Sequence, residues 1–380
     1  MIVSHLKAIR NNTIGADPNG AGSTAEREDG ERGPSQSRAG QSMSHVHAAG
    51  GEPNGLPIAV IVEREGLGDV LLKLPMLRAI ARGFPNRPIW WIAANITAVA
   101  DDLWPYLRGM VTEVRPLTGI SARKRTLALS RELPAFSLAF DTRTRIASIW
   151  HARQLLRRQR YFCCTPGYLL SDARPGRFMR PRHIGERAMS LARAALGDAA
   201  DGSGSLACGT AAREAARTLL PEGPIYVGLA VGSREARKNW PAECFKELAQ
   251  ALTAHGRVPV FLLGPQEAVV RDQFIAAAPG AIAIDMTQMN PQPAIGVLDA
   301  AIAVLERFAL VIANDSGLGH LAGAVGRPLL SLFGPTDPRR WAPMAPVSRV
   351  LRAQDYGKHE MSGIPVAAVL SAAESVLQGA

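Results

Sequence analysis

Short apolar runs alternate with longer amphipathic segments along the chain from Pro57 onward. The apolar runs are nearly continuous, which is typical of strands that are buried on both faces of a parallel sheet. The segments between them place apolar residues at helical spacing, so helices are expected to connect the strands. The pattern therefore predicts an α/β protein with parallel sheets covered by helices.

The pattern occurs twice, with a polar, glycine-containing stretch between Gly197 and Thr210. The strands expected before this stretch are Ile58–Val62, Ile89–Ala93, Val111–Val114, Phe136–Phe140 and Tyr161–Cys164, and those after it are Ile225–Val231, Val258–Leu263, Ala281–Ile284, Leu310–Ala313 and Leu329–Phe333. The expected helices are Asp69–Arg82, Thr144–Arg158, Ala242–Ala254, Gln266–Ala277, Ala294–Arg307, Gly319–Val325 and Val366–Leu377. Two Rossmann-like domains facing a central cleft are the predicted architecture.

Four parts of the chain follow from this division. Residues 1–56 are rich in small and polar residues without a hydrophobic period, so a disordered tail is predicted there. Residues 57–205 form the expected N-terminal domain and residues 206–352 the expected C-terminal domain. In the remaining segment, 353–380, the last helix is expected to pack back on the first domain.

Composition narrows the class of protein. The chain has 380 residues, 47% of them hydrophobic, which suits two globular domains. Its four cysteines contain no C-x-x-C pair, so a disulfide scaffold is excluded. No apolar stretch approaches the ~20 residues of a membrane-spanning helix, and no secretory signal is recognised. A cytoplasmic protein is therefore expected.

The net charge of +10 is distributed unevenly. Residues 57–205 contain 23 basic and 12 acidic residues, whereas residues 206–380 contain 15 of each. A basic field attracts polyanions, such as nucleic acid, an anionic membrane or a phosphorylated glycolipid. Charge alone leaves these three open, together with a general role in solubility.

Three loops follow expected strands, where α/β sheets bind their ligands. Gly66-Leu67-Gly68-Asp69 permits a tight turn and places an aspartate at a helix start, where it serves chemistry or caps the helix. The loop from Gly232 to Pro241 combines a Gly-Ser turn with three cations, a pattern suited to a diphosphate. Asn314-Asp315-Ser316-Gly317 opens a glycine-rich helix whose free N–H groups suit a phosphate.

Together these motifs resemble glycosyltransferase family nine, the ADP-heptose:lipopolysaccharide heptosyltransferases. The resemblance extends from Pro57 to Ala380, with every motif in family order. The motifs that carry it are Gly66-Leu67-Gly68-Asp69-Val70-Leu71-Leu72-Lys73-Leu74-Pro75, Lys238-Asn239-Trp240-Pro241, Asn314-Asp315-Ser316-Gly317 with His320-Leu321-Ala322, and Leu332-Phe333-Gly334-Pro335-Thr336.

The resemblance implies a GT-B fold and an inverting transfer that needs neither a metal nor another cofactor. It implies that Asp69 is the catalytic base. The expected donor-binding residues are Ser233, Lys238, Glu267, Asp315, Ser316, Gly317 and His320. The expected acceptor-binding residues are Gly68, Arg143, Arg174, Arg177, Arg180 and Arg182.

The implied partners are a nucleotide sugar, ADP-heptose in the first place, and an anionic lipopolysaccharide core acceptor. The arginine-rich region between Arg143 and Arg193 is expected to meet that acceptor and the inner face of the cytoplasmic membrane, whereas nucleic acid is not an expected partner. Two alternatives remain. One is a GT-B sugar-nucleotide epimerase, and the other is a polyanion-binding protein without catalytic activity.

Overall fold

The computed structural model describes residues 46–47, 55–176, 180–264, 266–286 and 295–379. The predicted disordered tail lies largely outside these residues. Within it, Val46–His47 form a short strand, β1, that pairs antiparallel with β4, which departs from the prediction for these two residues. No helix among the described residues has the length and apolar character needed to cross a bilayer.

The first sheet has the strand order β1-β4-β3-β2-β5-β6, and β2 to β6 are parallel. These strands are β2 (Ile58–Val62), β3 (Ile89–Ala93), β4 (Glu113–Arg115), β5 (Phe136–Asp141) and β6 (Arg158–Cys163). The helices of this part are α2 (Leu67–Gly83), α3 (Trp104–Leu107), α4 (Arg123–Glu132), α5 (Ile146–Leu155) and α6 (Ile184–Leu196).

The second sheet is parallel throughout, in the order β12-β11-β10-β7-β8-β9. Its strands are β7 (Tyr226–Ala230), β8 (Val258–Leu263), β9 (Ile282–Asp285), β10 (Leu310–Asn314), β11 (Leu329–Phe333) and β12 (Ser348–Arg352). Its helices are α7 (Thr210–Leu219), α8 (Ala242–Ala254), α9 (Arg271–Ala277), α10 (Val297–Leu305), α11 (Gly317–Val325), α12 (Pro338–Trp341) and α13 (Val366–Gly379).

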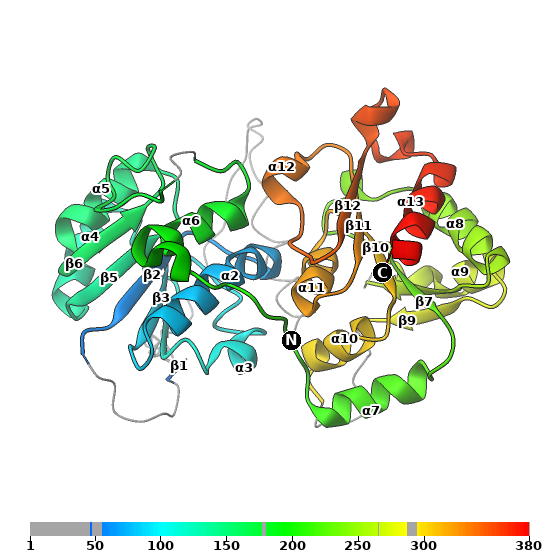
Figure 1. Cartoon of the computed structure of the whole chain (residues 1–380), viewed down its shortest axis with the longest axis horizontal. Coiled ribbons are helices and arrows are strands. Elements are labelled where there is room, and N and C mark those ends of the chain that lie inside the picture. Colours follow the sequence, from blue (N-terminus) through cyan, green and yellow to red (C-terminus); the bar gives the residue numbers. More distant parts are fainter. Residues whose placement is uncertain (1–45, 48–54, 177–179, 265, 287–294, 380) are drawn as a thin grey trace, which may run out of the picture. The chain divides into compact units, whose positions relative to one another are not determined.

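Helices cover both faces of each sheet (Figure 1). In the first sheet, alternate residues of β2 point to opposite sides: Ile58, Val60 and Val62 pack with α2 and α6, whereas Ala59 and Ile61 pack with α4 and α5. This two-sided burial is why the strand is apolar at every position. The predicted α/β class with two Rossmann-like sheets is confirmed.

Both sheets reverse their strand order beside their first parallel strand. In the first sheet β2 lies between β3 and β5, and in the second β7 lies between β8 and β10. At such a switch point the connections leave in opposite directions and open a crevice at the carboxyl ends of the strands. The loops after β2, β7 and β10, which the sequence singles out, therefore lie where this fold binds ligands.

The C-terminal segment differs from its prediction. Helix α13 packs against α8, and Val369, Ala372 and Ala373 join the core of the second sheet, not the first domain. The strand β12 was also not expected, because Ser348 and Arg349 are exposed at a sheet edge and interrupt its apolar pattern. Together, β12 and α13 complete the second α/β layer.

Candidate active site

Asp69 lies in the first turn of α2, directly after the glycine turn that follows β2. Its Oδ2 accepts a hydrogen bond from the backbone N–H of Gly66 at 3.1 Å, so the carboxylate does stabilise the helix start. It does this from the third helical position, because Gly66 is the N-cap residue. Among the described residues, Oδ1 of Asp69 has no hydrogen-bond partner, which leaves it available to a ligand.

Asp69 lines a pocket of about 250 Å³ whose wall is rich in charge. The basic residues of this wall are Arg64, Lys73, Arg143, Arg145, Arg187 and Arg340, and its acidic residues are Glu63, Glu65 and Asp69. Lys73 forms an ion pair with Glu65, and Arg143 forms one with Asp141. The remaining four arginines outnumber the two remaining carboxylates, so the pocket favours an anionic ligand.

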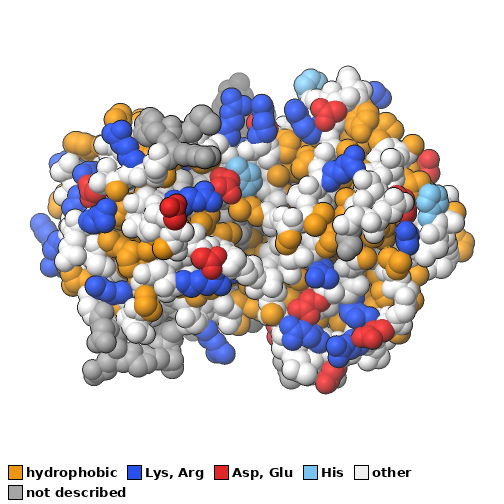
Figure 2. Space-filling view, in the orientation of Figure 1, with side chains coloured by type: hydrophobic (Ala, Val, Ile, Leu, Met, Phe, Trp, Pro, Cys, Tyr) orange, Lys and Arg blue, Asp and Glu red, His pale blue; other side chains and the backbone are white. Residues whose placement is uncertain are grey.

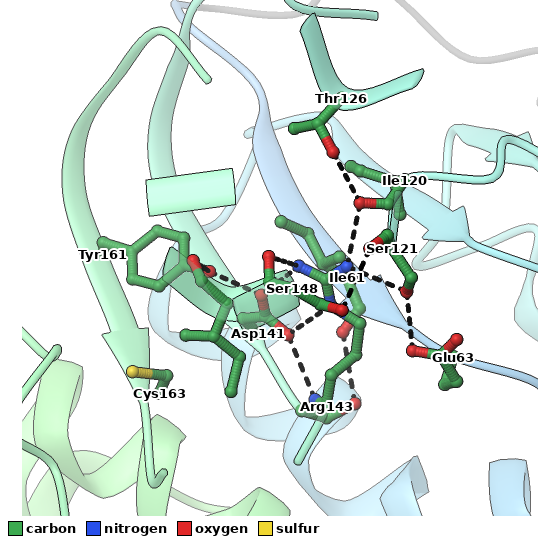
Figure 3. A network of polar contacts seen from close by, with 12 residues as sticks. Ile61, Glu63, Ile120, Ser121, Thr126, Asp141, Arg143, Ser148, Tyr161 and Cys163 are labelled. Carbon is green, nitrogen blue, oxygen red and sulfur yellow. Dashed lines mark hydrogen bonds and ion pairs between the residues drawn. The ribbon is translucent and has the colours of Figure 1, made fainter. Parts of the chain in front are cut away.

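Arg143, one of the predicted acceptor-binding residues, lines this pocket and is bound to internal partners. Its side chain is fully buried and pairs with Asp141 through Nε at 2.9 Å and Nη2 at 2.6 Å (Figure 3). Its other donors reach the carbonyl oxygens of Ile120 and Ser148 and the hydroxyl of Ser121. With its hydrogen-bonding groups used inside the protein, Arg143 is a structural residue of this network.

The Arg143 network supports the pocket from behind. Burial opposes the charged guanidinium, but the adjacent Asp141 carboxylate raises the pKa of Arg143 above its ordinary value. Burial, followed by the charge of Asp141, also raises the pKa of Tyr161, whose hydroxyl donates to that carboxylate. Ser121 links the network to Glu63 in the pocket wall through a 2.7 Å hydrogen bond (Figure 3).

The other predicted acceptor arginines that the structure describes lie outside the pocket wall. Arg174, Arg180 and Arg182 are exposed and do not line the pocket, and Arg177 lies outside the described residues. Arg187 lines it instead, and burial, with help from Arg180 and Arg340, lowers its pKa. Because Arg180 lies close enough to act on Arg187, the predicted cluster still adds positive charge near the site.

The donor loops come together around Lys238. Its Nζ lies 3.0 Å from Oδ2 of Asp315 and 3.2 Å from Oε1 of Glu235. Burial alone disfavours the charged ammonium, but hydrogen bonds to these two carboxylates raise the pKa of Lys238. Asp315 also accepts a 2.8 Å hydrogen bond from Thr336, so the loops after β7, β10 and β11 share one polar cluster.

The remaining predicted donor residues surround this cluster. Ser316 is the N-cap residue of α11, and Gly317 is the first residue of that helix. The hydroxyl of Ser233 donates to the backbone oxygen of Glu235. A Cβ atom at Gly232 would lie 2.6 Å from Oε2 of Glu267, so this glycine is needed for the carboxylate to approach the turn after β7.

His320 is buried where α11 packs against α2. A Cβ atom at Gly68 would lie 2.7 Å from Cδ2 of this imidazole, so Gly68 permits the close approach of the two helices. Burial lowers the pKa of His320 to about 4, although the charges of Asp315 and Asp69 oppose this shift. The loops that carry these two aspartates therefore converge on a neutral imidazole.

The model of the family described as glycosyltransferase family 9 (heptosyltransferase) matches residues 155–364, more than half of the chain. The chain belongs to glycosyltransferase family 9.

Two curated relatives illustrate the similarity. Lipooligosaccharide heptosyltransferase 2 of Haemophilus influenzae is 29% identical over 135 residues, which are 35% of this chain and 38% of that protein. Lipopolysaccharide heptosyltransferase 1 of Pseudomonas aeruginosa is 28% identical over 311 residues, 73% of this chain and 79% of that protein. The chain thus spans less than half the length of the first relative and most of the second.

A solved structure of the E. coli heptosyltransferase WaaC with ADP-2-deoxy-2-fluoro heptose shares the fold. Its TM-score is 0.58 at 21% identity, and the match covers 84% of this chain and 99% of that chain. The predicted GT-B type of architecture is confirmed.

The site residues predicted from the sequence of this family 9 protein do not include four arginines of the pocket, Arg64, Arg145, Arg187 and Arg340. Arg187 lies on α6, a helix that was not expected, and Arg340 lies on the short helix α12 after β11. A helical period between Ile184 and Leu196 would have indicated α6, but no local signal brings Arg340 to Asp69. Within the described part of the chain, no group of three or more His, Cys, Asp or Glu residues is arranged to hold a metal ion.

Proposed function

We propose that this protein transfers heptose from ADP-heptose to the core of lipopolysaccharide. The observation that carries the proposal is that Asp69 and the Lys238–Asp315 cluster both lie near His320. Among the described residues, one carboxylate oxygen of Asp69 has no hydrogen-bond partner. The names of the relatives, which are heptosyltransferases of lipopolysaccharide and lipooligosaccharide, support the sugar and the acceptor. The WaaC structure with an ADP-heptose analogue supports the donor.

The proposed reaction is one inverting displacement. The hydroxyl oxygen of the acceptor attacks the anomeric carbon of the donor sugar, and the bond from that carbon to the diphosphate breaks. Oδ1 of Asp69 accepts the proton of the attacking hydroxyl. The leaving ADP gains negative charge, which the Lys238 ammonium and the N-terminal N–H groups of α11 stabilise. We propose that these groups suffice without a metal or another cofactor.

The pocket beside Asp69 is the proposed acceptor site. Arg64, Arg145, Arg187 and Arg340 supply its excess of positive charge, which suits the phosphates and carboxylates of an inner-core glycolipid. Gly68 takes no direct part in this assignment, because it lies against His320. The acceptor residues proposed from the structure thus replace Arg143 and extend the exposed arginine cluster toward Asp69.

We also infer that the first domain meets the inner face of the cytoplasmic membrane, where such an acceptor is presented. On α5, Ile146 and Trp150 are one turn apart and 53% and 48% exposed, and Leu169 after β6 is 70% exposed. Exposed arginines at 157, 160, 174, 180 and 182 accompany them. Apolar side chains beside arginines suit the interface of an anionic bilayer.

The decisive test measures ADP release from ADP-heptose with and without a heptose-free lipopolysaccharide core. We expect release that requires the acceptor and survives EDTA. Asp69→Asn should lower kcat by ~10² or more while ADP-heptose affinity stays nearly unchanged, because only the proton acceptor is lost. Asp272→Asn is the matched control, since Asp272 lies in the first turn of α9 with its side chain 98% exposed.

The same assay separates the alternatives. Conversion of the donor alone to free sugar or to an epimer would favour the epimerase. Salt-sensitive binding of nucleic acid without binding of any sugar nucleotide would favour the polyanion-binding protein. Wild-type turnover by Asp69→Asn would overturn the role given to Asp69.

A further inference from the structure

A buried ion pair lies in the same pocket wall as Asp69. Nζ of Lys73 is 2.6 Å from Oε1 of Glu65, and the two side chains are only 9% and 1% exposed. Burying two charges sacrifices their hydration, and an apolar pair of similar volume often serves stability equally well. A gain in stability therefore does not explain why this ion pair is present.

Glu65 is fixed to the first sheet. Its Oε2 accepts hydrogen bonds from the indole of Trp91 at 3.1 Å and from the hydroxyl of Thr97 at 3.3 Å. Its backbone N–H also donates to the carbonyl oxygen of Ile96 at 3.1 Å. The carboxylate is thus held in place on the side opposite Lys73.

Both partners of the pair lead to Asp69. Besides binding Glu65, Nζ of Lys73 donates to the backbone carbonyl oxygen of Asp69 at 3.2 Å, one helical turn earlier. Glu65 directly precedes Gly66, whose N–H binds Oδ2 of Asp69. The backbone and the carboxylate of Asp69 are therefore held by groups that the ion pair itself positions.

The pair also balances charge beside the proposed base. Without Lys73, the buried Glu65 would be a third carboxylate in the pocket wall without an ion-pair partner among the described residues, beside Glu63 and Asp69. Two buried like charges repel each other more strongly than two like charges at the surface, because less water screens them. Because Lys73 neutralises Glu65, this rigid carboxylate lies in the pocket wall without adding net negative charge to the pocket.

We propose that Lys73 and Glu65 are a positioning pair for Asp69 in the glycosyl transfer, and this inference rests on the proposed function. Neither residue touches the reacting atoms. Lys73 holds the first turn of α2 through the Asp69 carbonyl and neutralises Glu65, which in turn anchors the turn between β2 and α2.

The test measures kcat, acceptor KM and ADP affinity for Lys73→Met, with enzyme concentration taken from an ADP-binding titration. We expect kcat per binding-competent enzyme to fall tenfold or more, while acceptor KM and ADP affinity change less than threefold. In the neutral double variant Glu65→Gln/Lys73→Met, kcat should be at least threefold higher than in Lys73→Met. The glutamine at position 65 carries no charge that needs a positive partner.

Lys246→Met is the matched control. Lys246 binds Glu243 at 2.8 Å on α8, a helix that does not line the pocket, so all three constants should stay at wild-type values. Thr97→Val is a milder variant that removes one hydrogen bond to Glu65 and keeps both charges. It should lower kcat two- to fivefold with an unchanged KM, even if Lys73→Met does not fold.

The outcomes separate this inference from the proposed function. Normal kcat in Lys73→Met and Thr97→Val, with Asp69→Asn inactive, would overturn the positioning pair and leave the function intact. A raised acceptor KM at normal kcat would make Lys73 an acceptor-binding residue and overturn the pair as well. An active Asp69→Asn would remove the function on which the pair depends.

Discussion

At the scale of single residues, His320 shows how burial sets a protonation state at the site. The imidazole is 8% exposed, and Nδ1 has no hydrogen-bond partner among the described residues. Burial lowers its pKa from the ordinary 6.5 to about 4, so it stays neutral throughout the physiological range. A neutral ring can pack against Gly68 without placing a third charge between Asp69 and Lys238.

This pKa predicts a pH dependence of stability. Between pH 6.5 and 4 the unfolded chain protonates this histidine and the folded chain does not, so the free energy of unfolding falls as pH falls. The loss is on the order of 3 kcal/mol and levels off below pH 4. Urea unfolding at pH 7 and pH 4.5 should show a smaller loss for His320→Gln than for wild type.

His359→Gln is the control for this prediction, because His359 is exposed. Its unfolding free energy should follow the wild-type pH dependence. An equal loss in wild type and in His320→Gln would show that His320 titrates alike in the folded and unfolded chains.

At the scale of elements, α11 depends on small residues where it meets other chain segments. A Cβ atom at Gly323 would lie 2.6 Å from the carbonyl oxygen of Met344, a backbone atom that cannot rotate away. The glycines and alanines of this helix allow close packing against its neighbours. The position of α11 in turn places Ser316 and His320 at the site.

Gly323→Ala should therefore destabilise the protein by about 1–3 kcal/mol, the usual cost of overpacking. Gly109→Ala is the matched change, because no atom lies within 4 Å of the Cβ position there and its φ is not positive. Denaturant unfolding compares the two. Equal stability of both variants would mean that α11 shifts freely away from Met344.

At the scale of the whole molecule, the two parts of the chain that form the two sheets differ in net charge. The donor loops belong to the second sheet, in the part of the chain without net charge, whereas basic residues gather in the first. Figure 2 shows basic and hydrophobic side chains interspersed on the surface around α4 and α5. This distribution suits the proposed ADP-sugar site at the second sheet. It also suits the proposed binding of an anionic membrane by the part of the chain that contains the first sheet.

We expect binding to anionic vesicles that is lost at high ionic strength, since each basic residue near the surface contributes ~1 kcal/mol that salt screens. Arg174→Glu/Arg180→Glu/Arg182→Glu should weaken vesicle binding and raise the acceptor KM, with ADP affinity unchanged. Arg217→Glu/Arg349→Glu/Lys358→Glu makes the same change in total charge at exposed positions of the second part. Equal effects of the two triple variants would show that only net charge matters.

The sequence by itself determined the two sheets, because a strand buried on both faces is apolar at nearly every position. β2 is apolar throughout, and β10 and β11 each contain a single buried polar residue, Asn314 and Ser331. It also identified Asp69, Lys238 and Asp315 as candidate site residues. The residues after parallel strands collect at one edge of each sheet, so position along the chain is enough to place them near a site. The edge strand β12 lacks that apolar pattern and was missed.

Only the tertiary structure decided which arginines serve the pocket and where the last helix packs. Arg143 and Arg187 both belong to a basic segment and both line the pocket, yet Asp141 and Ser148 bind the guanidinium of Arg143 inside the first domain. Arg340 reaches that pocket from beyond β11, and α13 has an apolar face that either sheet would accept. These features depend on contacts between segments that are distant in the sequence. Local periodicity indicates that one face of an element is buried, but it does not indicate which element covers that face.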